Sequence, residues 1–188
     1  MDAARELYAK PPSVDGLWDQ PVFTALPASN TPDALLDRFS SIYYGIGSVQ
    51  FARFSMATEP RLDWFLVCNR ENEIHFFAHL LASPAVRAPK TGSRTLRWEA
   101  LNATELADKF ASVLQQGGAY KRYQGGDAKA VSQQACQVLL GDHPEDQLVF
   151  RTSAAWSPWF GGVVWDNTWI GINKSTRRIW LLCATDSD

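Results

Sequence analysis

The stretch from Val163 to Ala184 reads VVWDNTWIGINKSTRRIWLLCA, two largely apolar runs separated by the polar segment 173–176. β-branched and aromatic residues dominate both runs, which is typical of strands, and the polar residues between them favour a hairpin turn. We therefore expect antiparallel strands at 163–172 and 177–184. This hairpin indicates an antiparallel sheet and decides the fold class.

The same patterns divide the rest of the chain. Strand-type runs, rich in aromatic and β-branched residues, occur at 49–56, 62–68, 73–81, 93–99 and 147–152. The polar tetrapeptide 69–72 is the expected hairpin loop between two of these strands. Apolar residues at helical spacing instead predict helices over 2–10, 32–45, 102–117 and 127–141.

Residues at the ends of the later helices support this division. Pro32 suits a first helical position, where its missing N–H is no loss. Asn102 and Glu105 have the spacing of a capping box, and Asp127 is the expected cap of the last helix. Gly117 ends the helix that begins after Asn102.

The length of 188 residues predicts a single domain over 1–188. Strands in consecutive groups, without regular β-α-β alternation, favour an α+β fold. We expect a mainly antiparallel sheet with three to four helices packed against it. Residues 1–31, which hold four of the ten prolines, are the expected extended N-terminal segment.

The composition excludes several classes of function. The chain has 18 Lys and Arg against 20 Asp and Glu, a net charge of −2, so a nucleic-acid ligand is not expected. We also expect no membrane-spanning segment. A chain of this size needs no cofactor or metal for stability, and we expect none. The three widely spaced cysteines are expected to be reduced core thiols, which favours a cytoplasmic protein.

No nucleotide, hydrolase or zinc-ligand motif occurs in the sequence, which favours a protein without catalytic activity. Glu71, His75 and His79 are spaced so that a helix would place them on one face, where they could bind a metal. The strand expected there favours two partly exposed histidines and no metal site.

Tryptophan is the most unusual feature of the composition, because five of the eight lie in the last 33 residues. Along 163–172, Trp165 and Trp169 share one face and Ile170 and Ile172 the other. If the isoleucines point inward, Trp165 and Trp169 stand outward near Trp159 and form a binding patch. If the tryptophans point inward, they pack near Phe110 and the patch disappears.

Interface candidates follow from these patterns. Trp, Tyr and Arg are enriched among the residues that anchor protein interfaces. A second group lies in the loop that two Gln-Gly-Gly triplets frame, at 116–118 and 124–126. We expect this loop to be exposed and mobile. The candidates are Trp156, Trp159, Trp165, Asp166, Trp169, Arg177, Arg178, Tyr120, Arg122 and Tyr123.

In size, charge, fold pattern and lack of catalytic motifs, the chain resembles the small cytosolic immunity proteins that bacteria pair with secreted toxins. The residues that carry the resemblance are the run from Gly162 to Ile172 and the segment from Leu181 to Asp188. The resemblance implies a class of protein and assigns no functional residue.

Two functions follow as expectations. The first is a non-catalytic protein-binding protein, most concretely an immunity protein that occludes the active site of a cognate toxin. Aromatic anchors would be desolvated at the interface, and acidic residues would face a basic cleft. The second is a small-ligand protein or enzyme with a Trp-lined pocket, in which His75 or His79 supplies acid/base chemistry.

Overall fold

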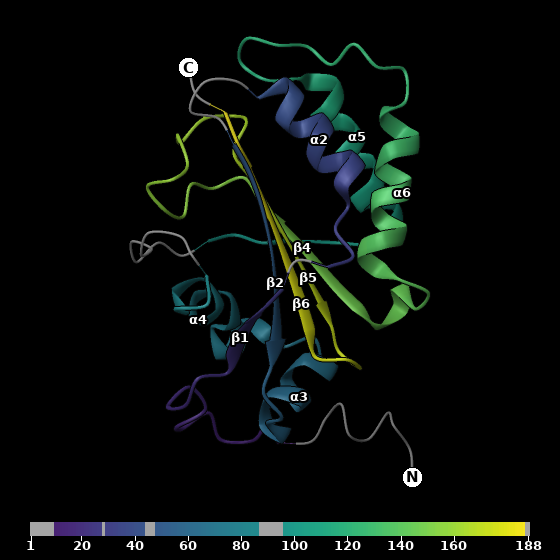
Figure 1. Ribbon diagram of the computed structural model, residues 1–188. Helices are drawn as coiled ribbons and strands as arrows, with labels where there is room; N and C mark the ends of the chain where they lie inside the picture. Colours follow the sequence, from purple (N-terminus) through teal and green to yellow (C-terminus); the bar gives the residue numbers. More distant parts are fainter. Residues whose placement is uncertain (1–9, 28, 44–47, 87–95, 187–188) are drawn as a thin grey trace.

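The computed structural model describes residues 10–27, 29–43, 48–86 and 96–186 (Figure 1). In this part of the chain, six strands form one sheet in the order β1-β2-β6-β5-β4-β3, and every neighbouring pair is antiparallel. The strands are β1 (Phe23–Leu26), β2 (Ser48–Met56), β3 (Glu99–Leu101), β4 (Gln147–Thr152), β5 (Asn167–Asn173) and β6 (Arg178–Thr185).

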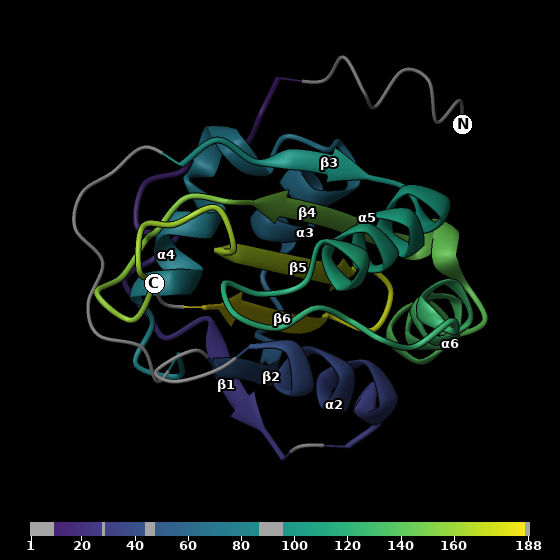
Figure 2. The same cartoon turned by 90° about the horizontal axis from the view of Figure 1, so that it is seen from above.

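Helices cover both faces of this sheet. Figure 1 shows α2, α5 and α6 on one side of the sheet and α3 and α4 on the other. Figure 2 shows the same arrangement from above. The described residues hold five α-helices, one more than the upper end of the expected range, and the α+β fold is confirmed. The helices are α2 (Asp33–Ile42), α3 (Pro60–Val67), α4 (Phe76–Ala82), α5 (Ala103–Gln116) and α6 (Ala128–Leu140), with short 3₁₀ turns η1 (Glu71–Ile74) and η2 (Pro144–Asp146).

Three of the four expected helices are found, and α5 shows why the sequence predicts them well. Its capping box is complete: the Asn102 N–H donates to Glu105 Oε2 at 2.7 Å, and the Glu105 N–H donates to Asn102 Oδ1 at 2.9 Å. The helix ends at Gly117, as expected. The helix expected over 2–10 lies outside the described residues, apart from Lys10.

The strands expected at 62–68 and 73–81 are wrong, because these segments form α3, η1 and α4. Pro60 begins α3, and the Glu59 carboxylate caps it by accepting from the Arg61 N–H at 3.1 Å. The aromatic and leucine residues of α4 then fall on one buried helical face. The expected hairpin loop at 69–72 is therefore part of a helix-to-helix connection.

Two strands differ from expectation at their ends. The expected extended N-terminal segment contains β1, a short strand that lies between Pro21 and Pro27. The strand expected at 93–99 is wrong for its described residues, because 96–98 are not in a strand and β3 covers Glu99–Leu101 instead. Residues 93–95 lie outside the described part. β4 occupies 147–152 as expected.

The expected hairpin at the centre of the sheet is present, with β5 paired to β6. β5 begins at Asn167 instead of Val163, because the preceding residues turn around Asp166. Both faces of β5 are buried: Ile170 and Ile172 join one apolar cluster, and Trp169 joins the other. The assumption that only one face of this sheet is core is therefore wrong.

Trp169 is the largest fully buried side chain. Its ring stacks on Phe39 of α2, with centroids 5.9 Å apart, and meets the edge of Phe110 of α5 at 5.1 Å. Gly171, two residues along the strand, leaves room for the indole of Trp180, into which a Cβ at this position would project. Two tryptophans of neighbouring strands thus pack against one helical layer.

We expect Trp169→Ala to lower the free energy of unfolding by about 3–5 kcal/mol, because it removes a filled aromatic contact and leaves a cavity. Urea unfolding monitored by far-UV circular dichroism measures the change. Trp159→Ala, at a half-buried tryptophan, should cost clearly less. Equal losses for the two variants would contradict a special role of Trp169 in the core.

Candidate functional site

The tryptophans expected at an interface do not form one aromatic surface. Trp159 packs against the apolar cluster beneath α3 and α4, whereas Trp165 packs against the cluster beneath α2, α5 and α6. Trp169 lies in the second cluster with no exposed surface. Because the sheet lies between Trp159 and Trp165, the expected patch of Trp159, Trp165 and Trp169 is not present.

Other candidates are also held in the structure. Trp156 is buried, and its Nε1–H donates to Thr168 Oγ1 at 2.8 Å. The guanidinium of Arg177 binds both oxygens of Asp63 on α3, with Nε donating to Oδ1 at 3.0 Å. Arg178 is exposed at the start of β6. Trp156 and Arg177 thus stabilise the fold, and the remaining candidates cluster in two loops.

The first loop, residues 117–127, connects α5 to α6. At its start, Gly117 and Gly118 are buried, and a Cβ on Gly118 would collide with the Ile42 carbonyl and the Asp186 carboxylate. The Gly118 N–H donates to the Lys121 carbonyl at 2.8 Å, which closes a tight turn. The loop is therefore fixed at this end, where we expected a mobile segment, and Tyr120 at its tip is 67% exposed.

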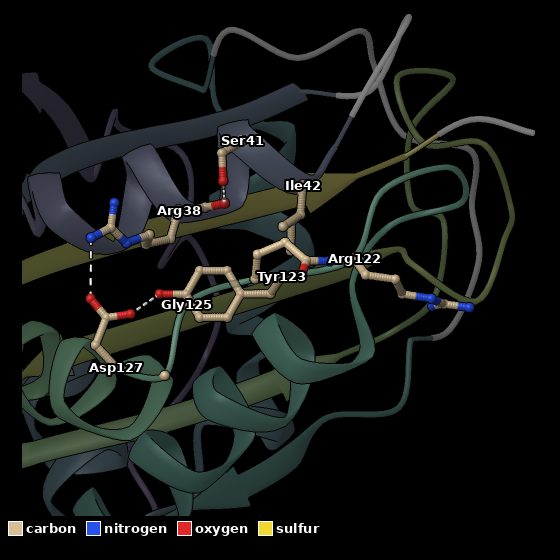
Figure 3. Close-up of a pocket in the computed structure, with 9 residues that line it drawn as sticks. Arg38, Ser41, Ile42, Arg122, Tyr123, Gly125 and Asp127 are labelled. Carbon is tan, nitrogen blue, oxygen red and sulfur yellow. Dashed lines mark hydrogen bonds and ion pairs between the residues drawn. The ribbon is translucent and has the colours of Figure 1, made fainter.

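The other end of the loop is held by Asp127. Figure 3 shows Arg38 of α2 and Tyr123 of the loop both reaching this carboxylate, while the Arg122 side chain extends away from them. Arg38 Nη2 lies 3.1 Å from Asp127 Oδ2, and the Tyr123 hydroxyl donates to Oδ1. Asp127 was expected to cap α6, but its side chain makes no cap bond and binds these two residues instead.

The groups around Asp127 shift the pKa values of Asp127 and Tyr123. The hydrogen bond from Tyr123 and the nearby Arg38 guanidinium lower the pKa of Asp127, and burial, with the bond to Asp127, raises the pKa of Tyr123. A carboxylate with a lowered pKa is a weak base, and a tyrosine with a raised pKa is a weak acid. Arg38, Tyr123 and Asp127 line a pocket of about 590 Å³, and their contacts hold this end of the loop to α2.

The second loop, residues 161–166, is held by Asp166. This fully buried carboxylate accepts from the Gly162 N–H at 2.7 Å and the Val163 N–H at 3.0 Å through Oδ2. Its Oδ1 accepts from the Thr185 hydroxyl at 2.5 Å, at the end of β6. Val164, the residue after Val163, is 72% exposed. Asp166 is therefore an anchor of the loop and not itself an interface residue.

Both loops are attached to the same end of β6. Asp186, which follows Thr185 and is also buried, accepts from the Ala119 N–H at 2.8 Å. Tyr120 is the next residue after Ala119. Figures 1 and 2 show the two loops side by side at this end of the sheet. Asp166 thus fixes its own loop to Thr185, the last residue of β6, and Asp186, the next residue, fixes the first loop.

We define the loop face as Tyr120, Arg122, Val164 and Trp165. Tyr120 and Val164 are the exposed apolar side chains, Arg122 is exposed, and Trp165 is half-buried beside them in sequence. Sequence reasoning identified Tyr120, Arg122 and Trp165 but missed Val164 and the anchor Asp186. The sequence did carry one signal for the contact that holds the end of the first loop. Tyr123 and Asp127 lie four residues apart, on either side of Gly125-Gly126, and can therefore reach each other.

A buried hydroxyl lies beneath the loop face. It belongs to Tyr43, the residue after α2, and its Oη has no hydrogen-bond partner among the described residues. Burial raises its pKa, and the carboxylates of Asp186 and Asp166 raise it further. A neutral phenol beside two buried carboxylates completes the polar layer under the loops.

The histidines lie far from this face. His75 separates η1 from α4 in a left-handed conformation, and the His79 ring stacks on Trp18 with centroids 4.2 Å apart. Burial and the nearby His75 lower the pKa of His79. A hollow of about 530 Å³ is lined by Trp156 near β2, but neither histidine lines it. A Trp-lined pocket with acid/base chemistry by His75 or His79 therefore gains no support from this hollow and stays a prediction.

Neither ligand sites nor relatives assign a role to the loop face. No group of three or more His, Cys, Asp or Glu side chains suited to a metal occurs within 10–27, 29–43, 48–86 and 96–186. In the same residues, no helix has both the length and the apolar character needed to cross a bilayer. The chain matches no protein-family model and no curated protein. The geometry of the site therefore carries the functional argument.

We expect Asp166→Ala to lower the free energy of unfolding by about 2–3 kcal/mol or more, because two N–H groups and the Thr185 hydroxyl lose their acceptor. Urea unfolding measures the loss, and hydrogen exchange should show faster exchange of the Val163 amide. Asp127→Ala, at an exposed ion pair, is the matched control and should have a much smaller effect. A similar loss in both would contradict the role of Asp166 as a buried anchor.

Glu71 predicts a dependence of stability on pH. Glu71 is buried, its Oε2 has no hydrogen-bond partner in the part of the chain that the structure describes, and burial raises its pKa. A carboxyl whose pKa is higher in the folded than in the unfolded state stabilises the fold when protonated, and this contribution is lost as pH rises. Glu71→Gln should therefore unfold at higher urea than the unchanged protein at neutral pH, with the difference shrinking in acid. A constant difference across pH would contradict this origin.

Proposed function

We propose that this chain is a non-catalytic protein-binding protein that uses the loop face, most concretely an immunity protein that covers the active site of a cognate bacterial toxin. The observation that carries the proposal is the pair of exposed apolar residues, Tyr120 and Val164, on loops that buried aspartates fix to one strand end. Exposed apolar groups on a pre-ordered surface are what a protein interface uses to gain affinity without paying for loop ordering.

The composition of the loop face supports a protein partner over a small ligand. Tyrosine, tryptophan and arginine are the residue types enriched among interface anchors. The loop face lies on two loops at one end of the sheet, where it is placed to meet a cleft on a protein partner. Covering the opening of such a cleft is how we propose that it blocks an active site.

The charges on the first loop define the partner further. Arg122 is exposed two residues after Tyr120, and its Nη1 donates to the Gln116 carbonyl at 2.5 Å. Its charge favours acidic residues at the rim of the partner surface that meets this loop, while the expected pairing of acidic residues of this chain with a basic cleft stays a prediction. Such charges steer the encounter and set its dependence on salt.

The proposed place of action is the cytoplasm. Cys68, Cys136 and Cys183 are all free, and burial raises the pKa of Cys136 and of Cys183 to about 12. Buried free thiols with raised pKa values suit a reducing compartment. An immunity protein acting there would meet a toxin made in, or delivered to, the same cell.

Affinity capture of the tagged protein from its native host, with mass spectrometry of co-purifying proteins, identifies the partner. We expect one protein at stoichiometric level, whose enzymatic activity falls to background at a one-to-one ratio. Recovery of the chain without a stoichiometric partner, under conditions in which candidate toxins are expressed, would overturn the proposal.

Variants test whether the loop face is the surface used. Val164→Asp should weaken the complex at least tenfold, because it places a charge in a desolvated apolar contact. Val67→Asp is the matched control, since Val67 is 64% exposed on α3, on the other side of the sheet. Isothermal titration calorimetry measures both. Equal effects of the two variants, or none at Val164, would show that the partner binds elsewhere.

A further inference from the structure

β2 is longer than the strand that covers its outer side. β1 pairs only with residues 53–56 of β2, from Leu26 opposite Arg53 to Phe23 opposite Met56. On the inner side, β6 pairs with β2 along its whole length, without a bulge, from Ser48 to Ser55. Among the described residues, the segment 48–52 therefore has a neighbouring strand on one side only.

The hydrogen-bonding groups that face this open side can be assigned from the ladder. The Met56 N–H donates to the Arg177 carbonyl on the β6 side, and the Ala57 N–H donates to the Val22 carbonyl on the β1 side. In an antiparallel ladder the direction alternates from residue to residue. The N–H and C=O groups of Val49 and Phe51 thus point outward, and no described residue pairs with them.

The open segment also lacks the usual protection of a sheet edge. Edge strands are commonly guarded by proline, by charge or by shortness. Pro21 and Pro27 flank β1, and β3 at the opposite edge is three residues long and carries the ion-paired Glu99. The segment 48–52 reads SVQFA and has neither proline nor charge.

We propose that this edge of β2 pairs with the same edge of a second copy of the chain. An antiparallel pairing centred on Gln50 places Val49 opposite the partner's Phe51 and Phe51 opposite the partner's Val49, so each outward residue meets an outward residue and exchanges both hydrogen bonds. A hollow of about 530 Å³ lies along this part of β2, lined by residues 49–54 together with Ala25 and Leu26 at the end of β1 and with Leu181 and Cys183 of β6. The pairing removes further apolar surface of Val49 and Phe51, which are both half-buried, from contact with water.

The segment itself favours a second copy over an unrelated strand. Its outward groups are symmetric about Gln50, so two copies match in length and hydrogen-bonding phase. It carries no charge, so two copies brought together do not repel across the seam. The pairing joins the two sheets into one continuous sheet, and it does not depend on the loop face or on the proposed function.

Introducing a charge at Gln50, on the symmetry axis of the proposed dimer, tests the pairing. Gln50 is exposed and lies opposite its own copy, so Gln50→Lys and Gln50→Glu each bring like charges together. Analytical ultracentrifugation of the purified protein, at up to about 0.3 mM, should show a dimer whose dissociation constant rises about fivefold or more in either variant. An equimolar mixture of the two variants should recover dimerisation as a heterodimer.

Gln134→Lys, at an exposed glutamine on α6, is the matched control and should leave the dimer unchanged. Val49→Pro is a second probe, because it removes an outward N–H while the bonds to β6 remain, and it should also abolish the dimer. A monomer at every concentration would overturn the proposal. So would a dimer that both Gln50 variants and Val49→Pro leave intact.

Discussion

The packing of Trp169 between Phe39 and Phe110 is the contact on which the arrangement of the molecule depends. This indole lies at the centre of the sheet and is the point where β5, α2 and α5 meet. Because the opposite side of β5 is equally buried, the hairpin of β5 and β6 has apolar partners in both directions. A shift of this strand by one residue would therefore move the side chains of each apolar cluster to the opposite face of the sheet. A fixed register in turn fixes where the chain leaves the sheet.

The loop face inherits its order from that register. The end of β6 presents Thr185 and Asp186 at defined positions, and each fixes one loop, Thr185 through its bond to Asp166 and Asp186 directly. Buried carboxylates bonded to backbone N–H groups are strong determinants of loop conformation, because leaving those donors unpaired is costly. Exposed Tyr120 and Val164 are thus held by groups that lie wholly inside the protein. Order at the surface is a consequence of polar contacts beneath it.

The sequence predicted the elements whose signals are local and missed those decided by packing. The capping box of Asn102 and Glu105 and the hairpin of β5 and β6 are specified by nearby residues and are found as expected. The segments that form α3 and α4 have aromatic runs that suit either a strand or a buried helix, and only Pro60 with its cap Glu59 marked the helix. At the candidate site, Tyr120 and Arg122 are exposed as the sequence indicated, but the burial of Trp156 and Asp166 follows from contacts between distant segments. A pattern with period two cannot reveal that both faces of a strand are covered.

The position of β6 in the sheet also constrains how the chain acquires its structure. Residues 178–185 are the only link between β2 and the strands β3 to β5 within the described sheet. Pairing β2 with β6 closes a loop of more than a hundred residues, which is slow compared with forming a local hairpin. During synthesis on the ribosome, the side of β2 that pairs with β6 therefore stays open until this late segment emerges, although β1 is already available to pair with residues 53–56. The molecule is then exposed to misassembly in that interval, and its yield in the cell depends on how quickly that one strand arrives or on help from a chaperone.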